Sequence, residues 1–181
     1  AQNGFSYRPA LAKSMLAAAG YKDTNGDGFV ENKDGSKIDL SIIVPNGWSD
    51  WMTAIQVISE SAKQVGIKIT PSYPEYATLT DDRGHGRYDL LLGNDRQMSN
   101  TPWTYYQYIY NLPITDNQTT MNYQRFTDQA SFNLTQKLNR TPSTNTKAYQ
   151  TILTSLQKRF LQTLPAIPLW YNGMWSMVNT Q

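Results

Sequence analysis

The most regular arrangement of chemically active side chains in the sequence is an acidic stretch over residues 23–34. Its oxygen-bearing residues recur at alternate positions, and a glycine occupies the sixth. The groups that could ligate a hard cation are Asp23, Asn25, Asp27, the Phe29 carbonyl, Glu31 and Asp34. Calcium loops use this spacing because a hard cation needs several oxygens around one point. We therefore expect a structural calcium ion, with a carboxylate from Asp34 or Glu31 completing its ligands, and no other cofactor.

Two features of the same stretch favour a metal-free turn instead. Asp34 is one methylene shorter than the glutamate that usually closes a calcium loop, and a strand rather than a second helix is predicted to follow at Ile38. Aspartate and asparagine side chains also stabilise surface turns through hydrogen bonds to nearby backbone, without any ion. The sequence leaves both interpretations open.

A second candidate site lies within residues 88–110, where polar side chains come directly after a short apolar run. Residues 88–92 have the length of a buried strand. Ligands collect beyond the carboxyl ends of strands in open α/β sheets, so Asn94, Asp95 and Arg96 are predicted to bind one. Flat aromatic faces follow closely, from Trp103, Tyr105, Tyr106, Tyr108 and Tyr110. The alternative is an ordinary loop that leads into an aromatic core helix.

Aromatic rings beside planar polar groups suit a sugar, because sugar rings have apolar C–H faces and hydroxyls at their rims. All five tryptophans lie near the ends of predicted elements. Those beside turn residues, which we expect to be exposed to a cleft, are Trp48, Trp103 and Trp175. For Trp51 and Trp170, packing in the core or on a helix face is favoured. Asn122 and Asn172 are weaker polar candidates, since Asn172 could serve only its own turn.

The framework that must position these residues alternates strands and helices in the first half of the chain. Strands are predicted over residues 37–45, 67–73 and 88–92, and helices over residues 9–19, 51–65 and 76–83. A strand–helix–strand unit of this size predicts a right-handed, parallel crossover. Helices are predicted over residues 126–138 and 144–163, before a hairpin at Asn172-Gly173. Apolar residues at helical spacing predict the buried faces of the three longer helices, which are Trp51, Ile55, Ile58, Ala62 and Val65 before a stop at Gly66, then Phe126, Ala130, Leu134 and Leu138, and then Tyr149, Ile152, Leu153, Leu156, Phe160 and Leu164. The fold class is a layered α/β arrangement.

Length and composition exclude several classes. A chain of 181 residues can bury a sizeable core and is expected to form one domain or lobe. Its net charge of +2, with 17% charged residues and no basic block, argues against nucleic-acid binding. The absence of cysteine excludes disulfides and thiolate metal sites. No apolar run reaches the roughly 20 residues of a membrane span. The first residues lack a signal peptide and read as the start of an excised fragment.

Two further function classes are weighed and disfavoured. A glycoside hydrolase needs paired carboxylates. Asp50, Glu75 and Asp95 could serve, but no two of them lie in a sequence pattern recognisable as a catalytic pair. His85 is the single histidine, and its glycine neighbours indicate a loop rather than a catalytic triad. We therefore expect no enzyme activity. A calcium-dependent interaction module is disfavoured as the main role because one loop lies inside a much larger α/β lobe.

Four segments, taken in order, resemble a known family. They are AKSMLAAAGYKDTNGDGFVE, the helix over residues 51–65 with the following GIKITP, RYDLLLGNDRQMSNTPWTYYQY, and LPAIPLWYNGMWSMVN. This set resembles the C-terminal lobe of family 5 extracellular solute-binding proteins. The resemblance implies that residues 1–181 form one lobe of a two-lobe receptor. The implied fold is periplasmic-binding-protein-like, type II and dipeptide-binding-protein-like, with a mixed β-sheet, helices packed on it and a C-terminal hairpin.

The same resemblance implies a function. Such proteins are the substrate-binding components of ABC importers, so the implied partners are permease subunits and a small extracellular ligand. Three segments resemble those of receptors for cello- and laminari-oligosaccharides: GWSDWM, NDRQMSNTPWTYY and PLWYNGMW. This resemblance implies that the ligand is a β-glucan-type di- or oligosaccharide. The alternative ligand is an oligopeptide or dipeptide. The implied location is extracellular, either as a cell-surface lipoprotein or in the periplasm.

Overall fold

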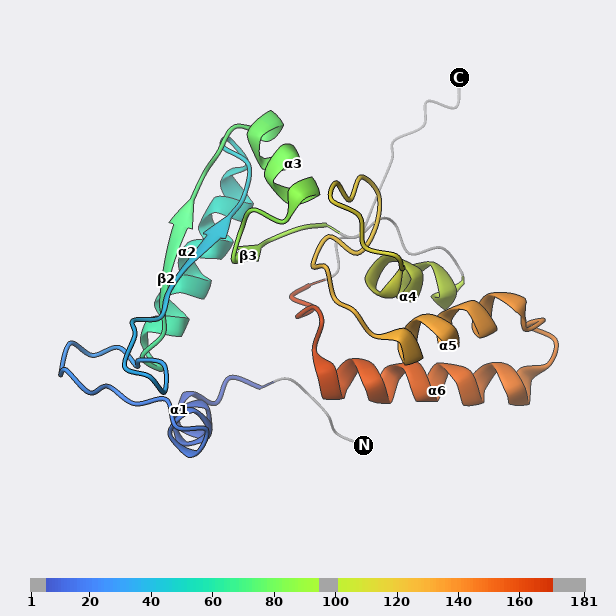
Figure 1. Ribbon diagram of the computed structural model, residues 1–181, viewed down its shortest axis with the longest axis horizontal. Helices are drawn as coiled ribbons and strands as arrows, with labels where there is room; N and C mark the ends of the chain where they lie inside the picture. The colour runs from blue at the N-terminus through green and yellow to red at the C-terminus, as the bar shows by residue number, and fades with distance from the viewer. Residues whose placement is uncertain (1–5, 95–100, 171–181) are drawn as a thin grey trace, which may run out of the picture. The chain divides into compact units, whose positions relative to one another are not determined.

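The computed structural model describes residues 6–94 and 101–170 (Figure 1). The chain divides into two compact units. The N-terminal unit comprises Ala1–Asp95 with Asp116–Thr119, and the C-terminal unit comprises Arg96–Thr115 with Thr120–Gln181. Each unit has a hydrophobic core of its own.

The N-terminal unit is built on a three-stranded sheet in the order β2-β1-β3. The strands are β1 (Asp39–Ile43), β2 (Lys68–Ser72) and the very short β3 (Leu90–Leu91). Both pairings are parallel, with Ile42 of β1 opposite Pro71 on one side and Leu90 on the other. The expected mixed sheet is therefore wrong for the residues that the structure describes. A helical crossover joins β1 to β2, and such a connection returns the chain in the same direction.

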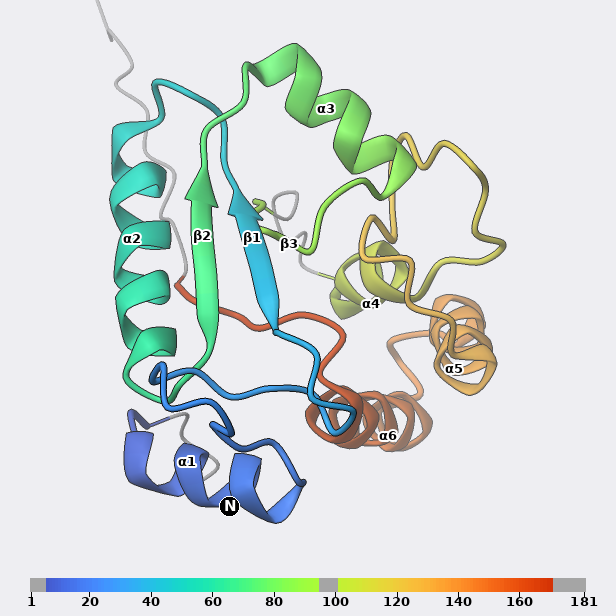
Figure 2. The ribbon, with the colours of Figure 1, turned by 60° about the vertical axis from the view of Figure 1, so that its left-hand side comes forward.

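Three helices complete this unit: α1 (Pro9–Ala18), α2 (Ser49–Lys63) and α3 (Tyr76–His85). Each was predicted within a few residues of its observed bounds. Figure 2 shows β1 and β2 pointing the same way, with α2 and α3 each beginning beyond the carboxyl end of the preceding strand. The side chains at the starts of these two helices therefore share one edge of the sheet with the strand ends.

The core of the N-terminal unit lies between the sheet and α2. Its buried members are Ile42, Val44, Trp51 and Ile55. Trp51 is 8% exposed, so the prediction that it packs in the core is confirmed. Gly66, at φ +84, follows the helix, and a Cβ there would lie 3.2 Å from Val30 Cγ1 of the acidic loop (residues 23–34). Glycine therefore both ends α2 and permits close approach of this loop.

The C-terminal unit is helical in its described residues, with α4 (Pro102–Tyr110), α5 (Gln129–Arg140) and α6 (Thr146–Thr163). Asp128 caps α5 by accepting hydrogen bonds from two backbone N–H groups, each at 3.1 Å. Asn145 caps α6 in the same way, with a bond of 3.3 Å. Caps of this kind satisfy the free N–H groups of a first helical turn.

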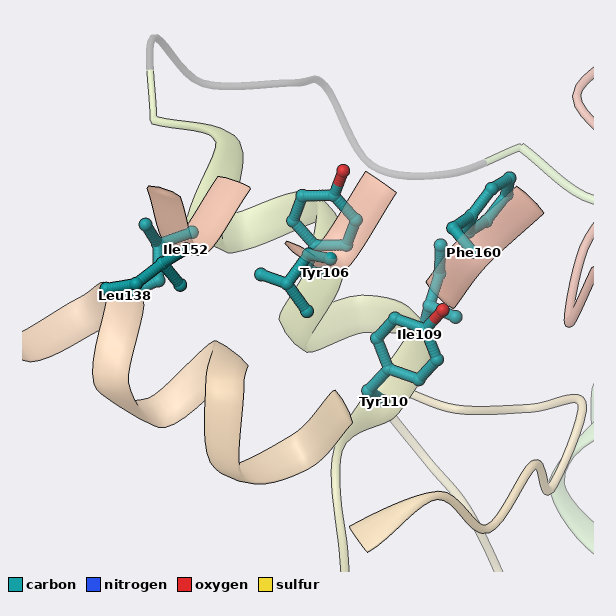
Figure 3. Packing of buried hydrophobic residues seen from close by; sticks show 7 residues of the cluster. Tyr106, Ile109, Tyr110, Leu138, Ile152 and Phe160 are labelled. Carbon is teal, nitrogen blue, oxygen red and sulfur yellow. The ribbon is translucent and has the colours of Figure 1, made fainter. Parts of the chain in front are cut away.

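Apolar side chains from all three helices meet in the core of this unit. Figure 3 shows this cluster, whose buried members are Tyr106, Ile109, Tyr110, Leu138, Ile152, Leu156 and Phe160. The predicted helical faces of α5 and α6 are confirmed at Leu138, Ile152, Leu156 and Phe160, which are all buried. Helical spacing thus identifies the buried face of each long helix correctly.

Three local predictions are wrong. Leu164 was expected to be buried, but it ends α6 in the left-handed conformation at φ +43 and is 46% exposed. Trp170 was expected to pack, but it is 51% exposed. His85 is the last residue of α3 rather than a loop residue, because the left-handed residue that ends the helix is Gly86. The predicted hairpin at Asn172-Gly173 lies outside the described residues. Within the described part, no helix is long and apolar enough to cross a membrane.

Candidate functional site

Exposed aromatic rings gather at the carboxyl edge of the sheet in the N-terminal unit. Trp48 and Tyr76 are stacked, with ring centroids 5.9 Å apart and planes at 21°. Trp48 also meets the buried Trp51 edge to face, with centroids 4.9 Å apart. Trp48 is 38% exposed and Tyr76 is 55% exposed. The prediction that Trp48 is exposed is confirmed, whereas Tyr76 was not among the sequence candidates.

The two loops that carry these rings are tied together by hydrogen bonds. The Asn46 backbone N–H donates to the Pro74 carbonyl at 2.9 Å. The Asn46 side-chain Nδ2 donates to Glu75 Oε1, also at 2.9 Å. Gly47, at φ +83, makes the turn that brings the chain from Asn46 to Trp48. The loop after β1 and the loop after β2 thus present one aromatic ring and one polar side chain each.

The third strand end carries the polar residues that the sequence singled out. Asn94 is exposed and follows β3 by a few residues. The turn before β3 is fixed because Asp89 Oδ2 accepts bonds from Ser41 N at 2.8 Å and Ser41 Oγ at 2.9 Å. These bonds, that from the backbone N–H first, lower the pKa of Asp89 below its usual range. Asp95, Arg96, Asn172 and Trp175 lie outside the described residues. The weaker candidate Asn122 is fully buried and its side-chain amide donates to the Asn111 and Phe126 carbonyls, so the prediction that it contacts a ligand is wrong.

Trp103 and the tyrosines after it belong to the C-terminal unit. Tyr106 and Tyr110 are 6% and 1% exposed, so the prediction that they form a recognition surface is wrong. Burial, followed by the neighbouring Tyr110, raises the pKa of Tyr106 to about 12. Trp103 is half-buried against the same core. Its indole nitrogen is buried, and no described residue accepts a hydrogen bond from it. The aromatic core helix, the alternative left open for this stretch, is the better description of α4.

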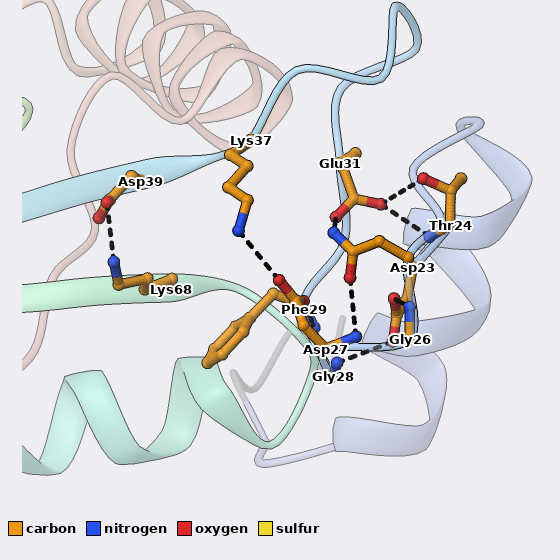
Figure 4. A network of polar contacts seen from close by, with 11 residues as sticks. Asp23, Thr24, Gly26, Asp27, Gly28, Phe29, Glu31, Lys37, Asp39 and Lys68 are labelled. Atoms are coloured by element: carbon orange, nitrogen blue, oxygen red, sulfur yellow. Dashed lines mark hydrogen bonds and ion pairs between the residues drawn. The ribbon is translucent and has the colours of Figure 1, made fainter.

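The acidic loop brings three carboxylates together, as Figure 4 shows. One oxygen of each of Asp23, Asp27 and Glu31 lies within 4.8 Å of the others. Glu31 is only 2% exposed and accepts hydrogen bonds from Thr24 N and Oγ1, both at 2.7 Å. Asn25 Nδ2 donates to the other Glu31 oxygen at 2.8 Å. Of the two carboxylates proposed to complete the loop, the structure therefore brings Glu31 to Asp23 and Asp27.

The other predicted ligands have different neighbours. Asp34 Oδ1 accepts bonds from Ser36 Oγ at 2.7 Å and from Ser36 N at 3.0 Å, which lower the pKa of Asp34 in that order and assign it to a separate turn. The Phe29 N–H donates to Asp27 Oδ1 at 3.0 Å and is the main cause of a lowered pKa at Asp27. Lys37 Nζ lies 3.3 Å from Asp27 Oδ2 on the exposed side. The lowered pKa keeps the Asp27 carboxylate ionised at neutral pH, and it lies close to the carboxylates of Asp23 and Glu31.

Residues 1–117 match the family described as bacterial extracellular solute-binding proteins, family 5 Middle. The chain belongs to this family. The expected resemblance is therefore confirmed at the level of the family. Because it is a family of binding proteins for extracellular solutes, the expectation that the chain is not an enzyme is also confirmed.

Solved structures support the same assignment. A mannohexaose-bound periplasmic oligopeptide-binding protein of an oligopeptide ABC transporter from Thermotoga maritima superposes with a TM-score of 0.88. Its sequence is 36% identical, and the match covers 96% of this chain and 32% of that one. The oligopeptide-binding protein AppA of Bacillus subtilis, in complex with a nonapeptide, gives a TM-score of 0.74 at 22% identity over 89% of this chain. These matches confirm an α/β lobe of a type II periplasmic binding protein.

Curated sequences agree over a shorter span. AppA of Bacillus subtilis is 34% identical over 86 residues, which are 48% of this chain and 16% of that protein. A probable ABC transporter-binding protein of Deinococcus radiodurans is 27% identical over 94 residues. The chain spans about a third of the length of the solved relatives, at 31–32%.

Sequence reasoning missed the strand-end residues Asn46, Glu75 and Tyr76 as members of one cluster. The signal that could have found them is their register, because each follows a predicted strand by a few residues, as Asn94 does. Polar and aromatic residues at the carboxyl ends of neighbouring parallel strands meet at one edge, whatever their separation in sequence.

Proposed function

We propose that this chain is the C-terminal lobe of a two-lobe receptor, the substrate-binding component of an ABC importer that captures an extracellular oligosaccharide. The observation that carries the proposal is its similarity, at 36% identity over 96% of the chain, to a protein whose structure holds mannohexaose. The exposed aromatic pair of Trp48 and Tyr76 beside polar strand-end residues supports a sugar. Within this class we favour a β-glucan-type di- or oligosaccharide.

The residues assigned to the ligand come from four stretches of the chain. Trp48, Trp103 and Trp175 are proposed to stack on sugar rings. Asn94, Asp95, Arg96 and Asn172 are proposed to bond hydroxyl groups. Hydrogen bonds that involve a charged group contribute roughly 1.5–3 kcal/mol, so Asp95 and Arg96 would dominate the polar recognition.

The partners and location follow from the same proposal. The complete receptor would deliver its ligand to the permease subunits of the importer, and it would reside outside the cytoplasmic membrane, in the periplasm or as a cell-surface lipoprotein. Receptors of this architecture close by hinge motion around the ligand, so each lobe supplies part of the contact surface. The isolated 181-residue chain is therefore expected to bind weakly.

Isothermal titration of the complete receptor tests the proposal. The panel contains cello-, laminari- and manno-oligosaccharides, and oligopeptides of matched length. We expect heat of binding with an oligosaccharide and none with the peptides. Binding of peptides alone would overturn the sugar proposal and favour the second candidate, an oligopeptide receptor, which the name of the 34% identical relative supports. Titration of the isolated chain with the same sugar should give an affinity at least about a hundred-fold lower.

A structural calcium ion in the acidic loop is a separate proposal. Asp23, Asp27 and Glu31 place three carboxylate oxygens within 4.8 Å of one another. Like charges at this separation repel, and the only described cation bonded to them is Lys37, on the exposed side of Asp27. Hard cations of the calcium type prefer such oxygen sets, to which Asn25 and the Phe29 carbonyl could contribute after a local rearrangement.

Thermal unfolding in calcium and in chelator tests this site. An ion that binds only the folded chain raises its melting temperature, so calcium should stabilise the wild type. Asp27→Asn should abolish the calcium-dependent part. Asp34→Asn is the matched control, because Asp34 bonds Ser36 instead and should leave the calcium response intact. Identical melting curves in calcium and chelator would identify the loop as a metal-free turn.

A further inference from the structure

The aromatic pair of Trp48 and Tyr76 is positioned by a contact with the core and is exposed to solvent. Trp48 stands edge-on against the buried Trp51, and the stacked Tyr76 ring comes from the start of α3. The two rings nevertheless remain 38% and 55% exposed. Aromatic rings are expensive to leave in water, and their positions here are fixed by the core rather than by their own burial.

A polar pair lies on the same two loops. Asn46 precedes Trp48 by two residues, and Glu75 directly precedes Tyr76. Their side chains bond each other at 2.9 Å and both residues are exposed. Glu75 occupies the N-cap position of α3, yet its side chain makes no cap hydrogen bond. Its carboxylate therefore does not perform the usual structural task of a residue at this position.

The aromatic pair and the polar pair together suit the binding of a pyranose ring. A pyranose ring has an apolar C–H face that packs on an aromatic ring and vicinal hydroxyls at its rim. A carboxylate accepts hydrogen bonds from two neighbouring hydroxyls, and an amide both donates and accepts. The bond from Asn46 uses one of the acceptor sites on Glu75 Oε1. The remaining acceptor sites of the carboxylate can accept hydrogen bonds from a ligand.

We propose that Trp48 and Tyr76 form a stacking platform for one pyranose ring, and that Asn46 and Glu75 bond the hydroxyls of that ring. The inference rests on the proposed function and adds a subsite that the residues after β3 do not include. Asn46, Trp48 and Glu75 lie in the loops after β1 and β2 and Tyr76 begins α3, so the subsite is complete within the N-terminal unit. Its occupant is a neutral sugar ring, whose apolar C–H face fits the platform and whose rim hydroxyls can donate to the Glu75 carboxylate.

Titration of the complete receptor with the oligosaccharide that binds it tests the subsite. Tyr76→Ala and Glu75→Gln should each weaken sugar binding by about ten-fold, through lost stacking and a lost charged acceptor respectively. Glu75→Gln keeps an oxygen for the Asn46 bond, so the loops should stay joined. Tyr76→Phe should bind as the wild type does, because the platform uses the ring face and not the hydroxyl.

Tyr7→Ala is the matched control. Tyr7 is also an exposed tyrosine of the N-terminal unit, at 66%, but it bonds Gln64 at the opposite end of α2. This variant should leave sugar affinity unchanged. Circular dichroism confirms that each variant is folded before titration.

The outcomes separate the subsite from the proposed function. If the wild type binds an oligosaccharide and the Tyr76→Ala and Glu75→Gln variants bind it equally well, the subsite is wrong and the receptor function stands. If the wild type binds only peptides, both fail. A ten-fold loss in Tyr76→Ala that Glu75→Gln does not share would also overturn the subsite, since it would reduce the site to apolar packing.

Discussion

Among the described residues, each unit contains one stacked pair of aromatic rings, and the two pairs have nearly the same geometry. In the Trp48–Tyr76 pair the centroids are 5.9 Å apart and the planes meet at 21°. In the Tyr106–Tyr110 pair they are 6.3 Å apart, at 10°. Their exposure is opposite, since Trp48 and Tyr76 are 38% and 55% exposed whereas Tyr106 and Tyr110 are 6% and 1% exposed. Ring stacking alone therefore does not separate a binding surface from a core.

What separates the pairs is where the backbone places them. Tyr106 and Tyr110 are one helical turn apart on α4, so their rings share the face that packs against α5 and α6. Trp48 lies in the loop after β1 and Tyr76 begins α3 beyond β2, and both rings remain exposed there. Density of aromatic residues at helical spacing thus indicates a core, and aromatic residues at strand ends indicate a surface.

The largest effect expected from this comparison is on the buried pair. Tyr110→Ala removes a side chain that is 1% exposed and leaves a cavity among three helices. We expect the free energy of unfolding to fall by about 3–5 kcal/mol. Urea unfolding followed by circular dichroism measures it. A loss below about 1 kcal/mol would show that α4 does not anchor this core.

The second prediction concerns the ion pair that joins α5 to α6 in the same unit. Arg159 Nη2 donates to both Asp128 oxygens at 2.7 Å, and Asp128 also caps α5. Asp128→Ala should therefore lower the free energy of unfolding by about 2–3 kcal/mol. Asp39→Asn is the control. Asp39 forms an exposed ion pair with Lys68 at 2.8 Å, so this substitution should lower the free energy of unfolding by under about 1 kcal/mol.

The pH dependence of stability should show the contribution of the same Asp128 carboxylate. Burial acts to raise the pKa of Asp128, but the bonds from Arg159 and Ser131 outweigh it, so the pKa is lowered in the folded state. A lowered folded-state pKa contributes stability above the unfolded value of about 3.9, and that contribution is lost as the pH falls through the folded-state pKa. Stability of the wild type should thus decline below about pH 4, and Asp128→Asn should flatten that decline. Parallel acid profiles would contradict this assignment.

Much of the fold was readable from the sequence because each long helix repeats its apolar residues at helical spacing. The faces of α2, α5 and α6 were predicted at residues such as Ile55, Leu138 and Leu156, and all three are buried. Gly66 marked the end of α2 because the chain needs a positive φ there. These features depend on neighbours within one or two turns, which a sequence shows directly.

The errors concern residues whose surroundings are distant in sequence. Tyr106 and Tyr110 were assigned to a recognition surface because they follow a strand end, and only their packing against α5 and α6 shows them to be core. The choice between Asp34 and Glu31, which the sequence left open, is decided by bridges at Lys22–Glu31 and Glu31–Lys37, which bring Glu31 to Asp23. Such pairings are set by backbone geometry and not by the spacing of a motif.

Trp103 stands between the two classes of aromatic residue and gives the fourth prediction. It is half-buried against the core of the C-terminal unit. Trp103→Ala should lower the free energy of unfolding by about 2 kcal/mol, less than a fully buried ring. Trp103→Phe should cost under about 1 kcal/mol, because it removes a buried indole N–H that no described residue accepts.

The ligand role proposed for Trp103 predicts a second readout on the same variants. If its ring stacks on a sugar, Trp103→Phe should retain most of the sugar affinity of the complete receptor, and Trp103→Ala should lose it. Unchanged affinity in Trp103→Ala, together with the loss of stability, would make this residue core alone. Recognition would then rest on Trp48 and Tyr76, in the other unit.

The smallest effect on stability is expected at the exposed pair. Tyr76 is 55% exposed and contacts Trp48 through one face, so Tyr76→Ala removes little buried area. The stacking contact is worth about 0.5–1.5 kcal/mol, and exposure places Tyr76 at the lower end, so unfolding should change by about 0.5 kcal/mol. The same urea titration as for Tyr110→Ala measures it. A loss as large as that of Tyr110→Ala would make the two pairs equivalent core elements and would remove the reason to regard the strand-end pair as a platform. A ring that can be removed at almost no cost to folding is one whose position is fixed by its neighbours and whose exposed area is available to a ligand.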